Sequence, residues 1–289
     1  MIVVFSGKCL DYWAPWHPES PDRVFLAHRM LREKGFSFVT PEPCDEDDLY
    51  LAHSREYVES IRSGRMTDVD TPSLPGIYDY AKLSAGAAVK SMEIALEGEM
   101  SFSLMRPPGH HAGIDGRALG AMSLGFCYFN NIAVACRRAL NQVEKVAIVD
   151  IDGHHGNGTQ EIFVGRTDVL FVSLHRYGFI YPGTGGGSEM NCLNYPFRYA
   201  IGDEEYLATL ETGLKEVARF DPDLIGVSAG FDTHRYDPYC SLGLGEDTYA
   251  EIGRMISRLE VRTFAVLEGG YGRYFPECVY KFLTGLDHA

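Results

Sequence analysis

The chain of 289 residues is 45% hydrophobic and carries a formal net charge of −14 at pH 7. This composition excludes a disordered chain and is typical of a globular protein, for which we predict one domain spanning residues 1–289. An acidic protein binds polyanions poorly, so we expect no direct nucleic-acid binding. The charge either steers cationic substrates towards the protein or serves solubility alone.

Apolar runs alternate with amphipathic segments along the chain. The apolar runs predict strands at residues 2–5, 101–105, 145–150, 169–174, 224–228 and 263–267. The amphipathic segments predict helices at residues 21–34, 77–96, 130–140, 204–220 and 247–259. This alternation predicts a single-domain α/β fold with a mostly parallel central sheet and helices on both faces.

The cysteines and the first residues of the chain predict a cytoplasmic location. The seven cysteines are scattered without a CxxC pair, which is typical of reduced, buried thiols. The N-terminus lacks the basic start and the long apolar stretch of a signal peptide. No apolar run approaches the roughly 18 residues of a membrane-spanning helix, so we expect no membrane partner. The sequence does not indicate an oligomeric state.

Polar, glycine-containing stretches directly follow four of the predicted strands. They read RPPGHH at 106–111, DIDGHHGNG at 150–158, AGFD at 229–232 and EGGY at 268–271. Open parallel sheets bind ligands beyond the carboxyl ends of their strands. The four stretches therefore predict one shared site at one edge of the sheet.

Asp152, His154 and Asp232 form the predicted metal site. Residues i and i+2 of an extended chain point to the same side, so Asp152 and His154 reach one cation, and Asp232 supplies a third ligand from another strand end. Three protein ligands with an open fourth position are typical of catalytic zinc. The oxygen-rich set also suits Fe²⁺ or Co²⁺. Taken alone, the Asp-x-His pair also fits a chance pair that forms loop hydrogen bonds.

His110, His111 and Tyr271 are the candidate catalytic groups. Two imidazoles on a proline-stiffened loop suit a general base and a general acid beside a metal. Asp150 is expected to accept the other N–H of one imidazole and so to fix its tautomer. The phenol of Tyr271 follows two glycines and suits donation to a polarised carbonyl, although, taken by itself, the residue is better explained as an ordinary turn tyrosine.

These stretches resemble the motifs of the histone deacetylase and acetylpolyamine amidohydrolase superfamily. Further similar segments are GFCYFNN at 125–131, VSLH at 172–175, YPGTG at 181–185, SAGFD at 228–232, LEGGY at 267–271 and an N-terminal HPE at 17–19. They follow the family order and cover nearly the whole chain. The resemblance implies an arginase-like α/β fold and one catalytic zinc ion.

The resemblance also implies roles for individual residues. The implied zinc ligands are Asp152, His154 and Asp232, and the implied catalytic residues are His110, His111 and Tyr271, with Asp150 beside the first histidine and Asn157 beside the second. The implied substrate channel comprises Gly125, Phe126, Tyr181, Tyr239, Gly269 and Gly270. A structural K⁺ ion is implied at Asp150, Asp152, His154, Ser173 and Leu174, and Arg23 matches an internal arginine beneath the site.

The implied reaction is hydrolysis of an N-acetylated or N-acylated amine. Zinc polarises the carbonyl and lowers the pKa of water towards about 7. His111 would deprotonate that water and later protonate the leaving amine, while Tyr271 and zinc stabilise the oxyanion. An acetyl-lysine side chain and a small acetylated amine such as an acetylpolyamine both fit, and the sequence does not separate them.

Two features depart from the family pattern. Residues 112–124 form a longer connection between His111 and Gly125 than is usual, which predicts a reshaped channel mouth. Tyr239 stands where leucine, methionine or glutamate is common, and we expect it to face the mouth and to influence substrate choice.

Two other functions fit parts of the pattern. A binuclear-manganese ureohydrolase-like enzyme needs DxHxD in one loop and DxD in another, but Gly156 and His234 stand where two of those aspartates would be. A catalytically inactive protein that binds acyl amines would be expected to have lost a ligand or the tyrosine, and all of them are present.

Overall fold

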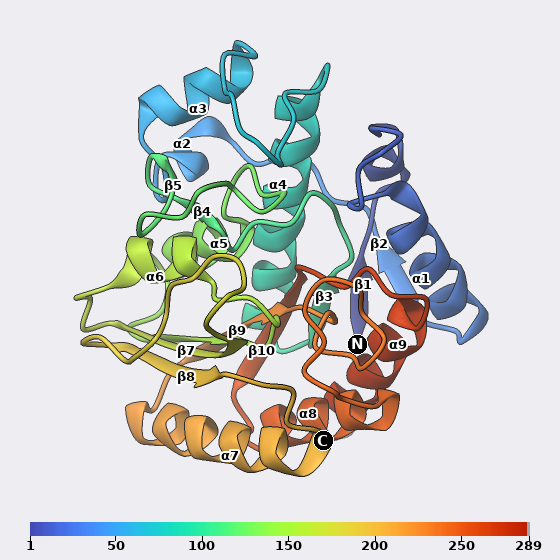
Figure 1. Cartoon of the computed structure of the whole chain (residues 1–289), viewed down its shortest axis with the longest axis vertical. Coiled ribbons are helices and arrows are strands. Elements are labelled where there is room, and N and C mark those ends of the chain that lie inside the picture. The colour runs from blue at the N-terminus through green and yellow to red at the C-terminus, as the bar shows by residue number, and fades with distance from the viewer. Residues whose placement is uncertain (288–289) are drawn as a thin grey trace.

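The computed structural model describes residues 1–287, and an eight-stranded sheet runs through its centre (Figure 1). The strands lie in the order β2-β1-β3-β10-β9-β6-β7-β8, and their pairings are parallel. Their bounds are β1 Ile2–Val4, β2 Ser37–Val39, β3 Ser101–Ser103, β6 Val146–Asp150, β7 Val169–Arg176, β8 Cys192–Phe197, β9 Leu224–Ala229 and β10 Arg262–Leu267. Two short strands, β4 Ala112–Gly113 and β5 Gly116–Arg117, form a separate antiparallel pair.

Helices cover both faces of the sheet and enclose two hydrophobic cores (Figure 1). One core is packed by α1 (Pro21–Glu33), α7 (Asp203–Phe220), α8 (Glu246–Ser257) and α9 (Phe275–Leu286). The other is packed by α2 (Glu46–Leu49), α3 (Arg55–Arg62), α4 (Ile77–Leu96) and α5 (Asn131–Ala139). The short helices η1 (Gly7–Leu10) and α6 (Asn157–Phe163) each contribute a buried side chain to a core.

The predicted α/β architecture is confirmed, with the ends of the predicted elements shifted by a few residues. The sequence patterns did not predict β2, β8, α2, α3, α6, α9 or the β4–β5 pair. β8 is an edge strand with the sequence CLNYPF, so it lacks the continuous apolar run of a buried strand. α6 is short and includes glycine, which weakens a helical pattern in the sequence.

The strand order explains why the polar stretches meet. β3, β10, β9 and β6 are consecutive neighbours in the middle of the sheet. The stretches 106–111, 268–271, 229–232 and 150–158 follow these four strands. Because the strands are parallel, all four stretches leave the same edge of the sheet. The predicted convergence at one edge is therefore a consequence of the topology.

A buried ionic network ties the N-terminal segment to this edge. Arg106 is fully buried and donates to both carboxylate oxygens of Glu19, each at 2.7 Å, and to the carbonyl oxygens of Cys9 and Tyr12. Arg23 donates to the same carboxylate at 3.1 Å. Burial alone would raise the pKa of Glu19, but Arg106 and Arg23 outweigh it, so the pKa lies below its usual value.

The structure also bears on the predictions made for the cysteines and for membrane-spanning helices. All seven cysteines are buried and free of disulfide bonds, as expected of reduced thiols. Among the helices of residues 1–287, none combines the length and the apolar character that a bilayer crossing requires.

Replacement of Arg106 by methionine should destabilise the fold strongly, because the buried carboxylate of Glu19 would lose both hydrogen bonds from Arg106 and keep only Arg23 as an ionic partner. The expected loss in the free energy of unfolding is about 3–5 kcal/mol, measured by urea denaturation. The double variant Glu19→Gln/Arg106→Met should recover part of this loss. A loss below about 1 kcal/mol for Arg106→Met would contradict the assignment, since that is typical of an exposed ion pair.

Candidate active site

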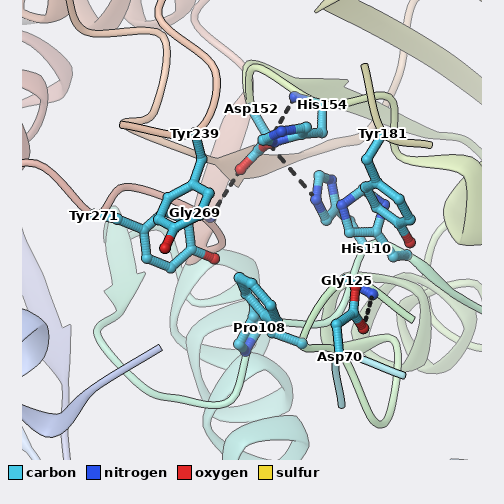
Figure 2. A pocket seen from close by; sticks show the side chains of 12 residues that line it. Asp70, Pro108, His110, Gly125, Asp152, His154, Tyr181, Tyr239, Gly269 and Tyr271 are labelled. Carbon is cyan, nitrogen blue, oxygen red and sulfur yellow. Dashed lines mark hydrogen bonds and ion pairs between the residues drawn. The ribbon is translucent and has the colours of Figure 1, made fainter. Parts of the chain in front are cut away.

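Loops at the carboxyl edge of the sheet line a cavity of about 240 Å³ (Figure 2). Figure 2 shows Tyr239 and Tyr271 on one side of it, and His110 and Tyr181 on the other. The lining residues are Asp70, Pro108, His110, His111, Gly125, Phe126, Asp152, His154, Tyr181, Tyr239, Gly269 and Tyr271. Most of the predicted site residues therefore surround one cavity.

His110 is a buried imidazole held by carboxylates. Its Nδ1 lies 2.9 Å from Oδ2 of Asp150, and its Nε2 lies 3.7 Å from Oδ1 of Asp152. Burial disfavours the imidazolium, but the charges of Asp150, Asp152 and Glu268 outweigh burial and raise the pKa of His110 to about 10. His110 is therefore suited to remain protonated and to act as an electrostatic group.

His111 lies in a contrasting environment. Its Nδ1 is 2.7 Å from Oδ1 of Asn157, a neutral partner. Burial, followed by the positive charges of His110 and His154, lowers its pKa well below the usual value. A neutral imidazole at the wall of a cavity is suited to accept a proton. The surroundings thus favour the charged form of His110 and the neutral form of His111.

Both carboxylates that were predicted as metal ligands lie close to the imidazole of His154. Nδ1 of His154 lies 2.6 Å from Oδ2 of Asp232 and 3.3 Å from Oδ1 of Asp152. Within the described part of the chain, Oδ2 of Asp232 is buried and, apart from this close contact with His154, has no polar partner of hydrogen-bond geometry. Two buried carboxylates beside an imidazole nitrogen form a donor set that suits a divalent cation such as Zn²⁺. The residues present therefore fit a metal ion.

Backbone groups aim the two ligand carboxylates. Oδ1 of Asp232 accepts from the N–H of Gly153 at 2.7 Å, which leaves Oδ2 directed at His154. Oδ2 of Asp152 accepts from the N–H of Gly269 at 2.8 Å. A Cβ atom at position 269 would lie 2.6 Å from Oδ2 of Asp152, so glycine permits this close approach.

Tyr271 is held from behind by Arg23. The guanidinium carbon lies 4.4 Å from the centre of the phenol ring, and Nε donates to the carbonyl oxygen of Gly270 at 2.6 Å. The main-chain N–H of Tyr271 donates to Oδ2 of Asp237 at 2.7 Å. Burial raises the pKa of Tyr271 well above its usual value, so the phenol stays protonated as a donor.

Aromatic rings form the walls of the cavity. The rings of Phe126 and Tyr239 lie 5.7 Å and 5.1 Å from that of Tyr271. Tyr181 packs edge-on against His111 at 4.8 Å, and its hydroxyl donates to the carbonyl oxygen of Ser123. The cavity thus has apolar sides and a polar floor, as small-molecule sites usually have.

Gly125 is required between these walls. Its φ of +55° lies in the left-handed region, and a Cβ atom there would approach Cδ2 of His111 to 2.5 Å and Cε1 of Tyr181 to 2.7 Å.

The residues predicted to hold K⁺ lie around neighbouring strand ends. Ser173 pairs with Asp150 in the register of β6 and β7, and its hydroxyl lies 2.8 Å from Nδ1 of His175. Leu174 is part of the core behind this strand. The potassium assignment stays a prediction.

Several polar residues that the sequence patterns missed support the site. Both Gly109 and His110 donate their N–H to Oε2 of Glu268. Asp70 lines the cavity and accepts from the N–H of Gly125. The signal for Asp70 in the sequence was the Asp-x-Asp pair that it forms with Asp68.

Cys240 was also missed as a neighbour of the ligands. Its sulfur lies within 4.8 Å of ligand atoms of His154 and Asp232 and donates to the carbonyl oxygen of Gly153. Burial raises the pKa of this thiol well above its usual value, so it acts as a neutral donor beside the ligand loop.

Known proteins are similar to this chain over almost its whole length. The family model for the histone deacetylase domain matches residues 17–286. The chain belongs to the histone deacetylase family. A probable deacetylase of Methanothermobacter thermautotrophicus is 39% identical over 99% of this chain and 91% of its own. Acetylpolyamine amidohydrolase 1 of Pseudomonas aeruginosa is 38% identical over 71% of this chain and 60% of its own.

Solved structures agree with this membership. The crystal structure of the HDA15 HD domain has a TM-score of 0.91 to this chain, with 31% identity, and the match covers 100% of this chain and 91% of that one. The fold is therefore the arginase-like fold of the histone deacetylase family. The deacetylase and amidohydrolase relatives indicate a hydrolase that acts on amide bonds.

Within this family fold, the donor set favours one metal ion over the two of a ureohydrolase-like enzyme. Gly156 has no side chain to offer. The ring of His234 packs against Tyr236 and Tyr274, and its Nε2 lies 3.6 Å from Glu246. His234 is therefore directed away from the point where the three predicted ligands meet.

Replacement of Asp232 by alanine should abolish metal retention, because it removes one of three converging donors. Metal content after gel filtration, measured by mass spectrometry, should fall from about one ion per chain to almost none. Tyr271→Phe is the matched control and should keep its metal. If Asp232→Ala retains the full content, the ligand assignment is wrong.

Proposed function

We propose that the protein is a zinc-dependent deacetylase that hydrolyses the amide of N-acylated amines, such as an acetyl-lysine side chain or an acetylpolyamine. The observation that carries the proposal is the meeting of His154 with two buried carboxylates at the floor of an aromatic-walled cavity. Membership of the histone deacetylase family and the names of the relatives support the same chemistry.

Asp152, His154 and Asp232 would hold the zinc ion. When bound, such an ion supplies Lewis acidity, which polarises a carbonyl and acidifies water. Fe²⁺ or Co²⁺ suits the same donors. We include in the proposal a structural K⁺ ion near Ser173 and Leu174, beside the ligand loop.

His111 would act as the general base and His110 as its charged neighbour. His111 is neutral because of burial and adjacent positive charge, so it is ready to accept a proton from the attacking water. The protonated form that results can return the proton to the leaving amine. His110 stays protonated through its contact with Asp150 and contributes positive potential where negative charge develops.

Tyr271 would donate a hydrogen bond to the developing oxyanion. Its raised pKa keeps the proton on the phenol, and the stacked Arg23 fixes the ring. The apolar walls at Phe126 and Tyr181 would accept the alkyl stem of the substrate and keep water from the reacting amide.

The proposal is tested by rates measured side by side on acetyl-lysine peptides and on acetylated putrescine, cadaverine and spermidine. The zinc-loaded protein should release acetate from at least one of these classes. Complete absence of turnover across a broad acyl-amine panel would favour the alternative of an inactive acyl-amine binding protein.

Tyr271→Phe should leave zinc bound and reduce turnover at least about tenfold, because it removes one oxyanion donor. The measurements are kcat on the best substrate and metal content of the same sample. Near-normal turnover would mean that the tyrosine serves structure alone.

Tyr239 is the candidate determinant of substrate choice. Its side chain is 45% exposed, while its ring lies 6.4 Å from that of Phe126 at the cavity. A phenol offers a large apolar face without charge at neutral pH, so it holds a distant ammonium only by a cation–π contact of roughly 0.5–2 kcal/mol. The neighbouring carboxylate of Asp237 is buried and accepts main-chain N–H groups. We therefore infer modest selectivity, limited by bulk at the mouth.

Changes at this position should move the ratio of kcat/KM for the two substrate classes. Tyr239→Leu should favour acetyl-lysine peptides relative to acetylpolyamines. Tyr239→Glu should favour polyamines that carry a second positive charge. If neither change moves the ratio by more than about threefold, or roughly 0.65 kcal/mol, Tyr239 does not control entry.

A further inference from the structure

The long connection of residues 112–124 is fastened to α6 beside the cavity. The carboxylate of Glu161 accepts from the N–H groups of Ile114 at 2.9 Å and Leu119 at 3.3 Å. One turn earlier on α6, Nδ2 of Asn157 donates to the carbonyl oxygen of Ala118 at 3.0 Å. Side chains four residues apart lie on the same side of a helix, so Asn157 and Glu161 both form hydrogen bonds with the same stretch of the connection.

Packing leaves no room between the connection and α6. A Cβ atom at Gly113 would lie 2.1 Å from Oε2 of Glu161, and one at Gly158 would lie 2.4 Å from the backbone of Ala112. Glycine at both positions allows the direct contact. The connection is therefore built onto the helix that carries Asn157.

Carboxylates also hold the two arms of the connection that flank Ala118. Arg117 donates to Oδ2 of Asp68 at 2.8 Å, and the hydroxyl of Ser123 donates to Oδ2 of Asp70 at 2.6 Å. The carbonyl of Ala118 thus lies in a segment that is bound by Asp68 and Asp70 on its two sides and by Glu161.

The side-chain amide of Asn157 has an oxygen that accepts hydrogen bonds and an NH₂ group that donates them. A half-turn of the amide exchanges an accepting oxygen for a donating NH₂ group. With Nδ2 on the carbonyl of Ala118, Oδ1 faces Nδ1 of His111 at 2.7 Å, so the proton must reside on Nδ1. The reversed amide would set two oxygens against each other at Ala118 and would place a donor against Nδ1. The proton of His111 would then move to Nε2.

We propose that Glu161 is a positioning residue, which fixes the tautomer of His111 through the Ala118 carbonyl and the Asn157 amide. The Nδ1–H tautomer leaves the lone pair on Nε2, where a general base needs it. The inference rests on the proposed function in taking His111 as that base. It gives the connection of residues 112–124 a role in catalysis.

The test is Glu161→Ala in the zinc-loaded full chain, observed by ¹⁵N NMR of labelled histidine. The signal of His111, assigned from its loss in His111→Gln, should report the Nδ1–H tautomer in the wild type at pH 7 and a mixture in the variant. On the best acyl-amine substrate, kcat should fall about tenfold while KM and metal content stay within about twofold, because only the base is affected.

Two matched variants separate tautomer control from general loosening. Glu56→Ala removes an exposed glutamate from α3 and should leave both readouts unchanged. In Asn157→Asp/Glu161→Ala, a carboxylate can only accept from His111, so the Nδ1–H tautomer should return without Glu161. A wild-type tautomer in Glu161→Ala, or a mixture that persists in the double variant, would overturn the inference.

The NMR readout also distinguishes this inference from the proposed function. The tautomer is observed without substrate, so a protein that turns over no acyl amine but loses the Nδ1–H tautomer in Glu161→Ala would refute the function and support the positioning role. Turnover of an acyl amine with an unchanged tautomer in Glu161→Ala would support the function and refute the positioning role.

Discussion

Two buried carboxylates that face one imidazole nitrogen are the constraint on which this structure depends. Asp152 and Asp232 would repel each other strongly in a low-dielectric interior. Main-chain N–H groups donate to both oxygens of Asp152 but to only one oxygen of Asp232. A cation held beside His154 would offset this repulsion. Several neighbouring features then have a common purpose, including the glycines that permit close approach and the tyrosine directed at the same cavity.

The same charge balance separates the two adjacent histidines. His110 contacts Asp150 and lies among carboxylates, whereas His111 contacts a neutral amide and lies beside positive charge. The charges around each ring therefore shift the pKa values of the neighbouring imidazoles in opposite directions. The amide partner must itself be oriented, because Asn157 can present either its oxygen or its NH₂ group, and the connection of residues 112–124 provides that orientation.

The sequence predicted the parts of this site that are local. Asp152 and His154 are two residues apart just beyond the end of β6, so their proximity is local in the sequence, and four such stretches indicated one edge of a parallel sheet. Contacts between distant segments were not predictable. Glu268 reaches the loop of His110, and Glu161 reaches Ile114 and Leu119, yet neither lies in a pattern that specifies its partner. The edge strand β8 was missed because Asn194 and Pro196 interrupt its apolar run.

The most direct test of the one-metal account is a titration of Zn²⁺ into metal-free protein with deacetylation followed throughout. The three proposed ligands predict no turnover without metal and a linear rise that reaches its plateau at about one ion per chain. A plateau at about two ions per chain would indicate a binuclear centre, and full turnover without metal would show that the carboxylates do not serve a cation. Either result would contradict the account.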